Sequence, residues 1–235
     1  MMEDVGKRVQ WVYESAGDVE ELGKRYDEWA RFYDSDITEH YGYQLPSRVA
    51  ELVTKYVTNK QNRILDAGAG TGLVGQLLHN LGFNNIIGID LSKGMLAEAE
   101  KKRVYTALHQ KVLGEDLGFD THLFDAVVCV GTLTIGHAPA SSLEELIRVT
   151  KSNGFIIFSM RPDVYENHGF KEKQDELVRG GFWRIAEVTE DFLGLPKGQP
   201  DGYNRIYVYR VLRTKSITNI GDDDGDVFHR WSLEL

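Results

Sequence analysis

Two aspartates and a run of alternate glycines have the spacing of a nucleoside-binding unit. Asp66 is followed by Gly68, Gly70 and Gly72, and Asp90 lies roughly 20 residues beyond these glycines, as in nucleotide-binding βαβ units. Glycine has no Cβ, so the backbone at these positions can come close to a bound ligand. A carboxylate at the end of the second strand can accept hydrogen bonds from the hydroxyls of a ribose. These residues therefore predict a nucleoside site.

The elements needed to position these residues are indicated by the surrounding pattern. Residues 63–66 and 86–90 are strand-forming and apolar, and residues 73–81 between them repeat apolar side chains at helical spacing. In an open parallel sheet, ligands sit beyond the carboxyl ends of the strands, where helix N-termini present free N–H groups. We therefore expect the glycines and Asp90 to meet at one edge of a parallel sheet.

Two overlapping motifs compete for the same glycines. Residues 70–75 match the dinucleotide fingerprint G-x-G-x-x-G, which would make the protein an NAD(P)-dependent oxidoreductase. That frame leaves residues 66–69 without a role. The frame Asp66-x-Gly68-x-Gly70-x-Gly72 accounts for every residue. In it, Asp66 either orders the loop or meets the ligand's ammonium group, directly or through water.

The second frame resembles motif I of the class I S-adenosylmethionine-dependent methyltransferases, and residues 88–92 with Met95 are similar to their second motif. The resemblance implies a Rossmann-like α/β fold: a seven-stranded, mostly parallel sheet with an antiparallel C-terminal hairpin and N-terminal lid helices. It implies S-adenosylmethionine as cofactor and S-adenosylhomocysteine as product. The residues it assigns to the cofactor are Tyr26, Tyr33, Asp66, Gly68, Ala69, Gly70, Gly72, Asp90, Leu91, Met95, Val112, Leu113, Val130 and Gly131.

Three further segments narrow the resemblance. Residues 26–30 (YDEWA), 124–139 and 148–154 (RVTKSNG) are similar to stretches of the methyltransferase-like proteins of the Williams–Beuren syndrome region. In many small-molecule methyltransferases the segment like residues 26–34 lids the cofactor, which makes Tyr26 and Tyr33 candidates to reach its methionine end. The resemblance does not name an acceptor.

The contact to adenine is left open by the sequence. The family often places an acidic residue after the third strand, expected here within residues 105–113. Either the backbone at Val112 and Leu113 meets the adenine, or Asp116 reaches back to it.

Candidates for acceptor chemistry lie in loops outside the glycine motif. His137 follows the predicted fourth strand and is a candidate general base, which only an acceptor that must lose a proton would need. Arg161 could pair with an acidic acceptor, and Tyr43 lies in a turn that could line its pocket. A catalytically silent cofactor-binding module is a further alternative.

The chain divides into four parts. Residues 1–17 are weakly patterned and predict a mobile arm, residues 18–62 predict N-terminal helices, and residues 63–212 predict the core. The two strands that close the sheet are expected at residues 182–188 and 204–211. Residues 213–235 read as a solvated acidic tail, whose aspartates lack the spaced glutamate of an EF-hand, so no metal site is expected.

Composition limits the classes of partner. The 235 residues carry a net charge of −9 without a dense basic cluster, so we expect a small-molecule acceptor and no nucleic acid. No apolar run approaches the ~20 residues of a membrane span, and the start lacks a signal peptide's apolar core. The single cysteine, Cys129, excludes an internal disulfide. We expect a cytoplasmic protein; its oligomeric state is not indicated.

Overall fold

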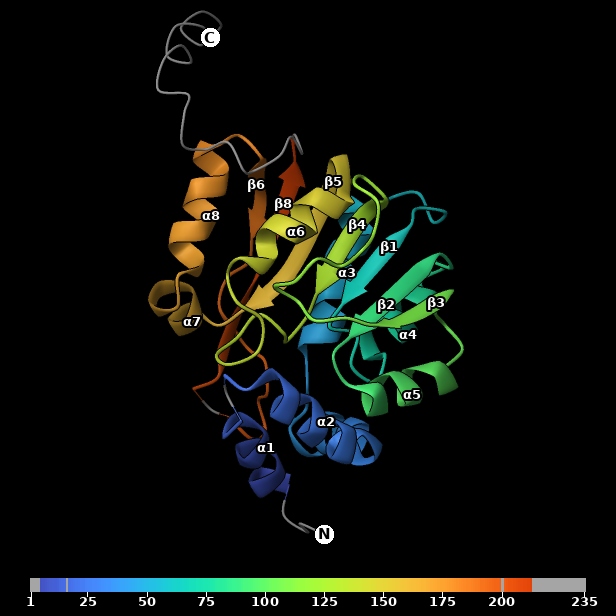
Figure 1. The fold of residues 1–235 in the computed structure, drawn as a ribbon, viewed down its shortest axis with the longest axis vertical. Coiled ribbons are helices and arrows are strands. Elements are labelled where there is room, and N and C mark those ends of the chain that lie inside the picture. Colours follow the sequence, from blue (N-terminus) through green and yellow to red (C-terminus); the bar gives the residue numbers. More distant parts are fainter. Residues whose placement is uncertain (1–4, 16, 200, 213–235) are drawn as a thin grey trace, which may run out of the picture.

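The computed structural model describes residues 5–15, 17–199 and 201–212, which form an eight-stranded sheet covered by helices on both faces (Figure 1). The first five strands pair in parallel, and β8 runs antiparallel to both β5 and β6. The fold prediction is confirmed, with the short strand β7, which the sequence left in a loop, added beside β8. In spatial order the strands are β3 (Ala107–Gln110), β2 (Ile86–Asp90), β1 (Ile64–Ala67), β4 (Phe124–Cys129), β5 (Thr150–Met160), β8 (Tyr203–Val211) and β6 (Trp183–Val188), with β7 (Phe192–Leu193) off this path.

Apolar side chains on both faces of the sheet hold the helices in place. In β4, Ala126 and Val128 belong to one buried cluster and Val127 and Cys129 to the other, as expected for a strand covered on both sides. The first cluster packs against α3 (Leu45–Tyr56) and α4 (Leu73–Asn80). The second packs against α6 (Ser142–Val149), α7 (Pro162–Asn167) and α8 (Phe170–Arg179), while α5 (Lys93–Lys101) follows β2.

The N-terminal helices lie across the edge of the sheet toward which the parallel strands run (Figure 1). They are α1 (Val5–Tyr13), α2 (Val19–Asp34) and the π-helical turn η1 (Ser35–His40). Asp18 caps α2 by accepting from the Glu21 backbone N–H at 2.9 Å, as its sequence pattern predicts. We refer to α1 and α2 together as the lid.

Within the predicted mobile arm of residues 1–17, residues 5–13 form α1, which the sequence pattern does not predict. Val5, Val9 and Val12 recur at helical spacing and pack onto Leu22 and Trp29 of the following elements. Three valines in nine residues are too short a pattern to predict a helix alone. Their burial depends on partners supplied by α2.

Two strands differ from their predicted extents. β3 comprises only Ala107–Gln110, and the chain leaves the sheet at Lys111, short of the predicted end at residue 113. β5 begins at Thr150, ahead of the turn predicted at residues 151–154. That segment is a bulge within the strand: Phe124 pairs with Thr150 and Ala126 with Phe155, and Asn153 adopts a φ of 68°.

Residues 213–235 lie outside the described residues, so the predicted acidic tail is not assessed by the structure. Among the helices of the described ranges, none combines the length and apolar character that crossing a bilayer requires. The same part of the chain contains no group of three His, Cys, Asp or Glu side chains able to hold a metal ion.

Candidate active site

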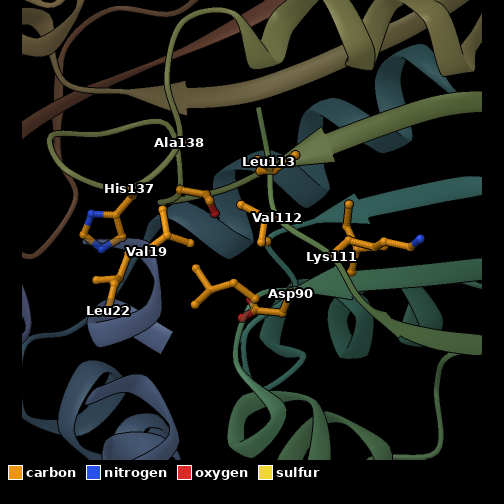
Figure 2. A pocket seen from close by; sticks show the side chains of 12 residues that line it. Val19, Leu22, Asp90, Lys111, Val112, Leu113, His137 and Ala138 are labelled. Atoms are coloured by element: carbon orange, nitrogen blue, oxygen red, sulfur yellow. The ribbon is translucent and has the colours of Figure 1, made fainter. Parts of the chain in front are cut away.

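A cavity of about 400 Å³ opens beside the end of β2, between the sheet and the lid (Figure 2). Asp90 and Val112 lie on its sheet side, and Val19 and Leu22 of α2 lie on the side of the lid. We call it the β2 cavity. Its complete lining is Val19, Leu22, Gly68, Ile89, Asp90, Leu91, Lys111, Val112, Leu113, Thr132, His137 and Ala138.

Asp90 is fixed by backbone donors on both sides. Oδ2 accepts from the Gly70 N–H at 2.8 Å, and Oδ1 accepts from the Ser92 N–H at 2.9 Å. Burial raises the pKa of Asp90 to about 6, although these N–H groups oppose the rise. The carboxylate therefore ties the glycine loop to the end of β2 and is still ionised at neutral pH.

A second cavity, of about 420 Å³, lies along the glycine loop and shares Gly68, Asp90 and Leu91 with the first. We call it the loop cavity. Gly70 adopts a φ of 54°, and a Cβ built there would meet no atom within 4 Å, so the loop is open toward this space. The lining is Tyr26, Tyr33, Gly68, Gly70, Asp90, Leu91, Met95, Val130, Gly131, Thr132 and His137.

The structure thus brings most of the predicted cofactor residues to two adjoining cavities. The loop cavity brings Tyr26 and Tyr33 of α2 to the ends of β1, β2 and β4. Tyr26 lies there beside His137, which follows it by 111 residues in the chain. Val112 and Leu113 line the β2 cavity, whereas the side chain of Asp116 is 83% exposed and faces Arg148 at 3.5 Å. Of the two alternatives for the adenine contact, the geometry favours Val112 and Leu113.

Asp66 lies in the interior of the protein and not at a cavity wall. It is fully buried below the glycine loop, is absent from the lining of both cavities, and accepts a hydrogen bond from the Tyr105 hydroxyl at 2.7 Å. Burial raises the pKa of Asp66 to about 7, an effect that the Tyr105 hydrogen bond opposes. Of the two roles the sequence left open, Asp66 orders the interior beneath the loop and does not face a ligand.

Ala69 and Gly72 shape the loop without lining either cavity. The Ala69 N–H donates to the Ile89 carbonyl at 2.8 Å, which joins the loop to β2. Gly72 precedes α4 with a φ of 89°, and its Cα faces Ala99 of α5. The expectation that both residues contact the cofactor is not supported by the geometry.

Tyr26 of α2 forms a hydrogen-bonded pair with His137, which lies in the loop after β4. The Ile135 carbonyl, 2.9 Å from Nδ1, can only accept, so Nδ1 carries the proton of the neutral ring. Nε2 is then an acceptor and lies 2.8 Å from the Tyr26 hydroxyl. Burial lowers the pKa of His137, which keeps the imidazole neutral at pH 7.

The lid is attached to the core by two aspartates of α2. Asp27 Oδ1 accepts from the Ser92 hydroxyl at 2.5 Å and from the Gly94 N–H at 2.7 Å, at the start of α5. At the other end of the helix, Asp34 accepts from the Thr71 hydroxyl and, at 2.5 Å, from the Lys102 ammonium. Both anchors join α2 to segments that flank the two cavities.

A third cavity, of about 730 Å³, adjoins the loop cavity at Tyr26, Tyr33 and Gly131, which line both. We call it the chamber. Tyr43, which the sequence placed beside an acceptor pocket, is in its wall. The full lining is Val9, Tyr13, Tyr26, Trp29, Tyr33, Ile37, Tyr43, Leu45, Gly131, Leu133, Thr134, Ser159, Met160, Arg161, Leu195, Gln199 and Asn204.

Sequence reasoning missed several of these residues. Thr132 packs against Gly68, whose Cβ would lie 2.1 Å from its Oγ1, and it lines both the β2 and loop cavities. Tyr13 and Trp29 have the helical spacing of core residues, so their place in the chamber wall has no signal of its own. For Thr132 the sequence does carry a signal, because this residue directly follows the predicted site residue Gly131.

The family described as "Methyltransferase domain" matches residues 65–158 of this chain. Human methyltransferase-like protein 27 is 34% identical over 165 residues, which cover 67% of this chain and 66% of the human protein. The chain therefore spans about two thirds of that relative's length.

Solved structures agree on the architecture. The [4+2]-cyclase SpnF has a TM-score of 0.64 at 18% identity, covering 84% of this chain and 98% of that one. The magnesium protoporphyrin IX methyltransferase of Synechocystis, solved with bound S-adenosylhomocysteine, has a TM-score of 0.54 at 19% identity, covering 71% and 83%. At these identities the likeness shows the fold alone.

Proposed function

Because this chain belongs to the class I S-adenosylmethionine-dependent methyltransferases, we propose that it methylates a small-molecule acceptor held in the chamber. One observation carries this proposal. Tyr26, Tyr33 and Gly131 line both the chamber and the loop cavity, so ligands in the two spaces would meet at these residues. Bringing two reactants into contact is the main contribution a protein makes to methyl transfer.

The residues around Asp90 fit the family's cofactor. Asp90 lines both the β2 cavity and the loop cavity, as a carboxylate that holds a ribose between an adenine and an amino-acid tail must do. We assign the adenine side to Leu91, Val112 and Leu113, and the methionine side to Gly68, Gly70 and Gly131. When bound, S-adenosylmethionine supplies an electrophilic methyl group on a sulfonium centre.

The pair Tyr26–His137 is the candidate route for a proton leaving a hydroxyl acceptor. His137 does not line the chamber, and Tyr26 lies between it and that space, which argues against His137 as a base in direct contact with the acceptor. Tyr26 lines the chamber and donates to the neutral Nε2 of His137. Tyr26 can therefore receive a proton from the acceptor while passing its own to His137.

The enclosed shape of the chamber supports a small acceptor. Its walls come from the lid, η1, the end of β5 and the segment between β7 and β8, so it is closed on several sides by packed elements. The nicotinamide alternative is set aside by the family match and by the strand order β3-β2-β1-β4-β5-β8-β6.

Calorimetry with S-adenosylhomocysteine tests the cofactor assignment. We expect binding by the native chain and a loss of at least ~2 kcal/mol in Asp90→Ala, because a charged hydrogen-bond partner is removed. Asp120→Ala, an exposed aspartate outside the three cavities, is the matched control and should bind as the native chain does. Equal affinities in native and Asp90→Ala chains would refute the assignment.

Turnover is tested by following S-adenosylhomocysteine release over a panel of phenols, amines and carboxylic acids. Release that depends on one class of acceptor supports the proposal. Tight cofactor binding without turnover on any class would favour a catalytically silent module instead.

A further inference from the structure

We propose that the acceptor is a planar aromatic molecule carrying an anionic group, with its ring against the tyrosines and tryptophan of the chamber and its anion at Arg161. This inference rests on the proposed function and adds the chemical class of the acceptor. It draws on the aromatic walls of the chamber, the charges of its lining and the position of Arg161 at the end of β5.

The chamber walls are rich in aromatic rings. Trp29 stacks on Tyr26 with ring centroids 6.0 Å apart, and it forms an edge-to-face contact with Tyr33 with ring centroids 4.8 Å apart. Tyr13 and Tyr43 complete the aromatic lining. Offset-stacked and edge-to-face contacts favour a flat ring over an aliphatic chain of equal volume. The walls therefore select for a planar acceptor.

The charges of the lining select against a cation. Aromatic cages also bind ammonium groups, so the rings alone leave the sign of the acceptor's charge open. Arg161 is the one charged side chain among the described residues that line the chamber, and no carboxylate lines it. A cationic acceptor would be repelled by Arg161, whereas an anionic acceptor would be attracted to it.

Arg161 retains donors for such an anion. Its Nε and Nη2 donate to Asp163 at 2.9 Å each, at the exposed start of α7, and no hydrogen bond joins Nη1 to the described residues. A guanidinium carries five N–H donors, so it can bind a second carboxylate while keeping the first. Asp163 itself does not line the chamber. Arg161 thus keeps donors for an anion in the chamber while Asp163 neutralises part of its charge at the start of α7.

The position of Arg161 also orients the acceptor. Arg161 lines the chamber but neither of the other two cavities, whereas Tyr26 and Tyr33 line the chamber and the loop cavity. An acceptor held by its anion at Arg161 would keep that charge away from the junction. The atom that receives the methyl group would then lie on the part of the ring nearest Tyr26.

Three probes that share a phenol ring and carry para substituents of different charge test the inference: 4-hydroxybenzoate (anionic), 4-hydroxybenzamide (neutral) and 4-hydroxybenzylamine (cationic), titrated into the full chain saturated with S-adenosylhomocysteine. We expect the benzoate to bind at least about tenfold more tightly than the amide, equivalent to ~1.4 kcal/mol, and the amine to bind most weakly. Isothermal calorimetry or ligand-observed NMR gives the dissociation constants without turnover.

Two substitutions of opposite sign sharpen the test. Arg161→Gln should abolish the preference for the benzoate. Asp163→Asn removes the negative charge that neutralises the guanidinium and should tighten benzoate binding several-fold, which a merely structural role for the pair would not do. Arg184→Gln, an exposed arginine of β6 that lines none of the three cavities, is the control and should leave all three affinities unchanged.

The outcomes separate the two proposals. If S-adenosylhomocysteine binds but none of the probes does, or if the amine binds best, the inference about the acceptor is overturned and the proposed methyl transfer stands. If S-adenosylhomocysteine itself does not bind, the proposed function fails first.

Discussion

The β2 and loop cavities differ from the chamber in how the chain builds them. Most residues that line the β2 and loop cavities lie at or just beyond the ends of the parallel strands, and Asp90 is tied to Gly70 and Ser92 at 2.8 and 2.9 Å. The chamber is lined by residues from segments as far apart in the chain as Val9 and Asn204. Parallel-sheet topology fixes the first kind of site, because the carboxyl ends of the strands always meet there. The second depends on which side chains distant segments contribute.

This difference predicts which property a substitution at each site should change. A change on the cofactor side should alter the fold or the affinity for S-adenosylhomocysteine, since backbone and ligand contacts coincide there. A change in the chamber wall should alter the affinity for the acceptor and leave the affinity for S-adenosylhomocysteine unchanged. Substitutions at residues that line both kinds of site should alter both affinities. These residues are Tyr26, Tyr33 and Gly131.

The largest change in the free energy of unfolding is expected from Asp66, which belongs to the glycine-loop motif but faces the interior. A carboxyl with a pKa of about 7 when folded and 3.8 when unfolded binds more protons in the native state. Its contribution to the free energy of unfolding is therefore full below pH 3.8 and falls as the pH rises to 7, by up to about 4 kcal/mol. Urea unfolding between pH 4 and pH 8 should show this decline in the native chain.

Asp66→Asn removes the ionisation while keeping an acceptor for the Tyr105 hydroxyl. Its stability should match the native chain near pH 4 and exceed it at pH 8. Asp120→Asn, on the surface, serves as the control and should follow the native curve. A native stability that rises from pH 4 to pH 7, with Asp66→Asn less stable at pH 8, would contradict the burial argument.

The next effect concerns Gly131, at the junction of the two kinds of site. Its φ is 70°, and a Cβ there would lie 2.5 Å from the Tyr43 hydroxyl. Gly131→Ala should lower the free energy of unfolding by about 1–2 kcal/mol from backbone strain, with a further loss from displacing Tyr43. Gly169 has a φ of 75° and no atom within 4 Å of a built Cβ, so Gly169→Ala measures the strain alone. Equal losses in the two variants would mean that Tyr43 moves freely.

A smaller effect is expected where the lid meets the core. Asp27→Asn replaces charge-assisted hydrogen bonds from Ser92 and Gly94 by neutral ones and should cost about 1 kcal/mol. Hydrogen exchange of the α2 amides should speed up, and S-adenosylhomocysteine should bind more weakly because α2 covers the β2 cavity. Glu28→Gln, at an exposed position of the same helix, should change neither reading.

The smallest effect tests the chamber wall alone. Tyr13 is 45% exposed, so Tyr13→Leu should leave folding intact while removing one aromatic surface. Acceptor affinity should fall roughly three- to tenfold, the usual contribution of an aromatic contact. The dissociation constant of S-adenosylhomocysteine should not change. A parallel loss in both affinities would show that chamber and cofactor cavities are not separable.

The residues that line the β2 and loop cavities could be grouped from the sequence because their determinants are local. Gly68, Gly70 and Asp90 sit within one βαβ unit, so their spacing alone places them. The sequence leaves the role of Asp66 open because its partner, Tyr105, lies 39 residues away and reaches it past Gly75 and Gly88, whose built Cβ atoms would lie 2.3 and 3.0 Å from the tyrosine ring. No local pattern reports such a contact.

The chamber was largely unpredictable for a related reason. Trp29 and Tyr33 recur at the spacing of an ordinary amphipathic helix, which cannot distinguish a cavity wall from a packed core. Tyr13 lies in a helix whose burial depends on α2. His137 was found as a residue, but its Tyr26 partner and its neutral tautomer follow only from the tertiary structure.

Helix α2 has one more consequence, for the order of events in a catalytic cycle. Leu22 covers the β2 cavity, while Tyr26 and Tyr33 of the same helix cover the loop cavity and the chamber. If α2 moves as a rigid helix, it cannot open one of these cavities without also opening the others. S-adenosylhomocysteine and the methylated product should therefore be released during the same movement of the helix. We expect rapid mixing to reveal a burst of product in the first cycle followed by a slower steady rate, with that movement as the slow event.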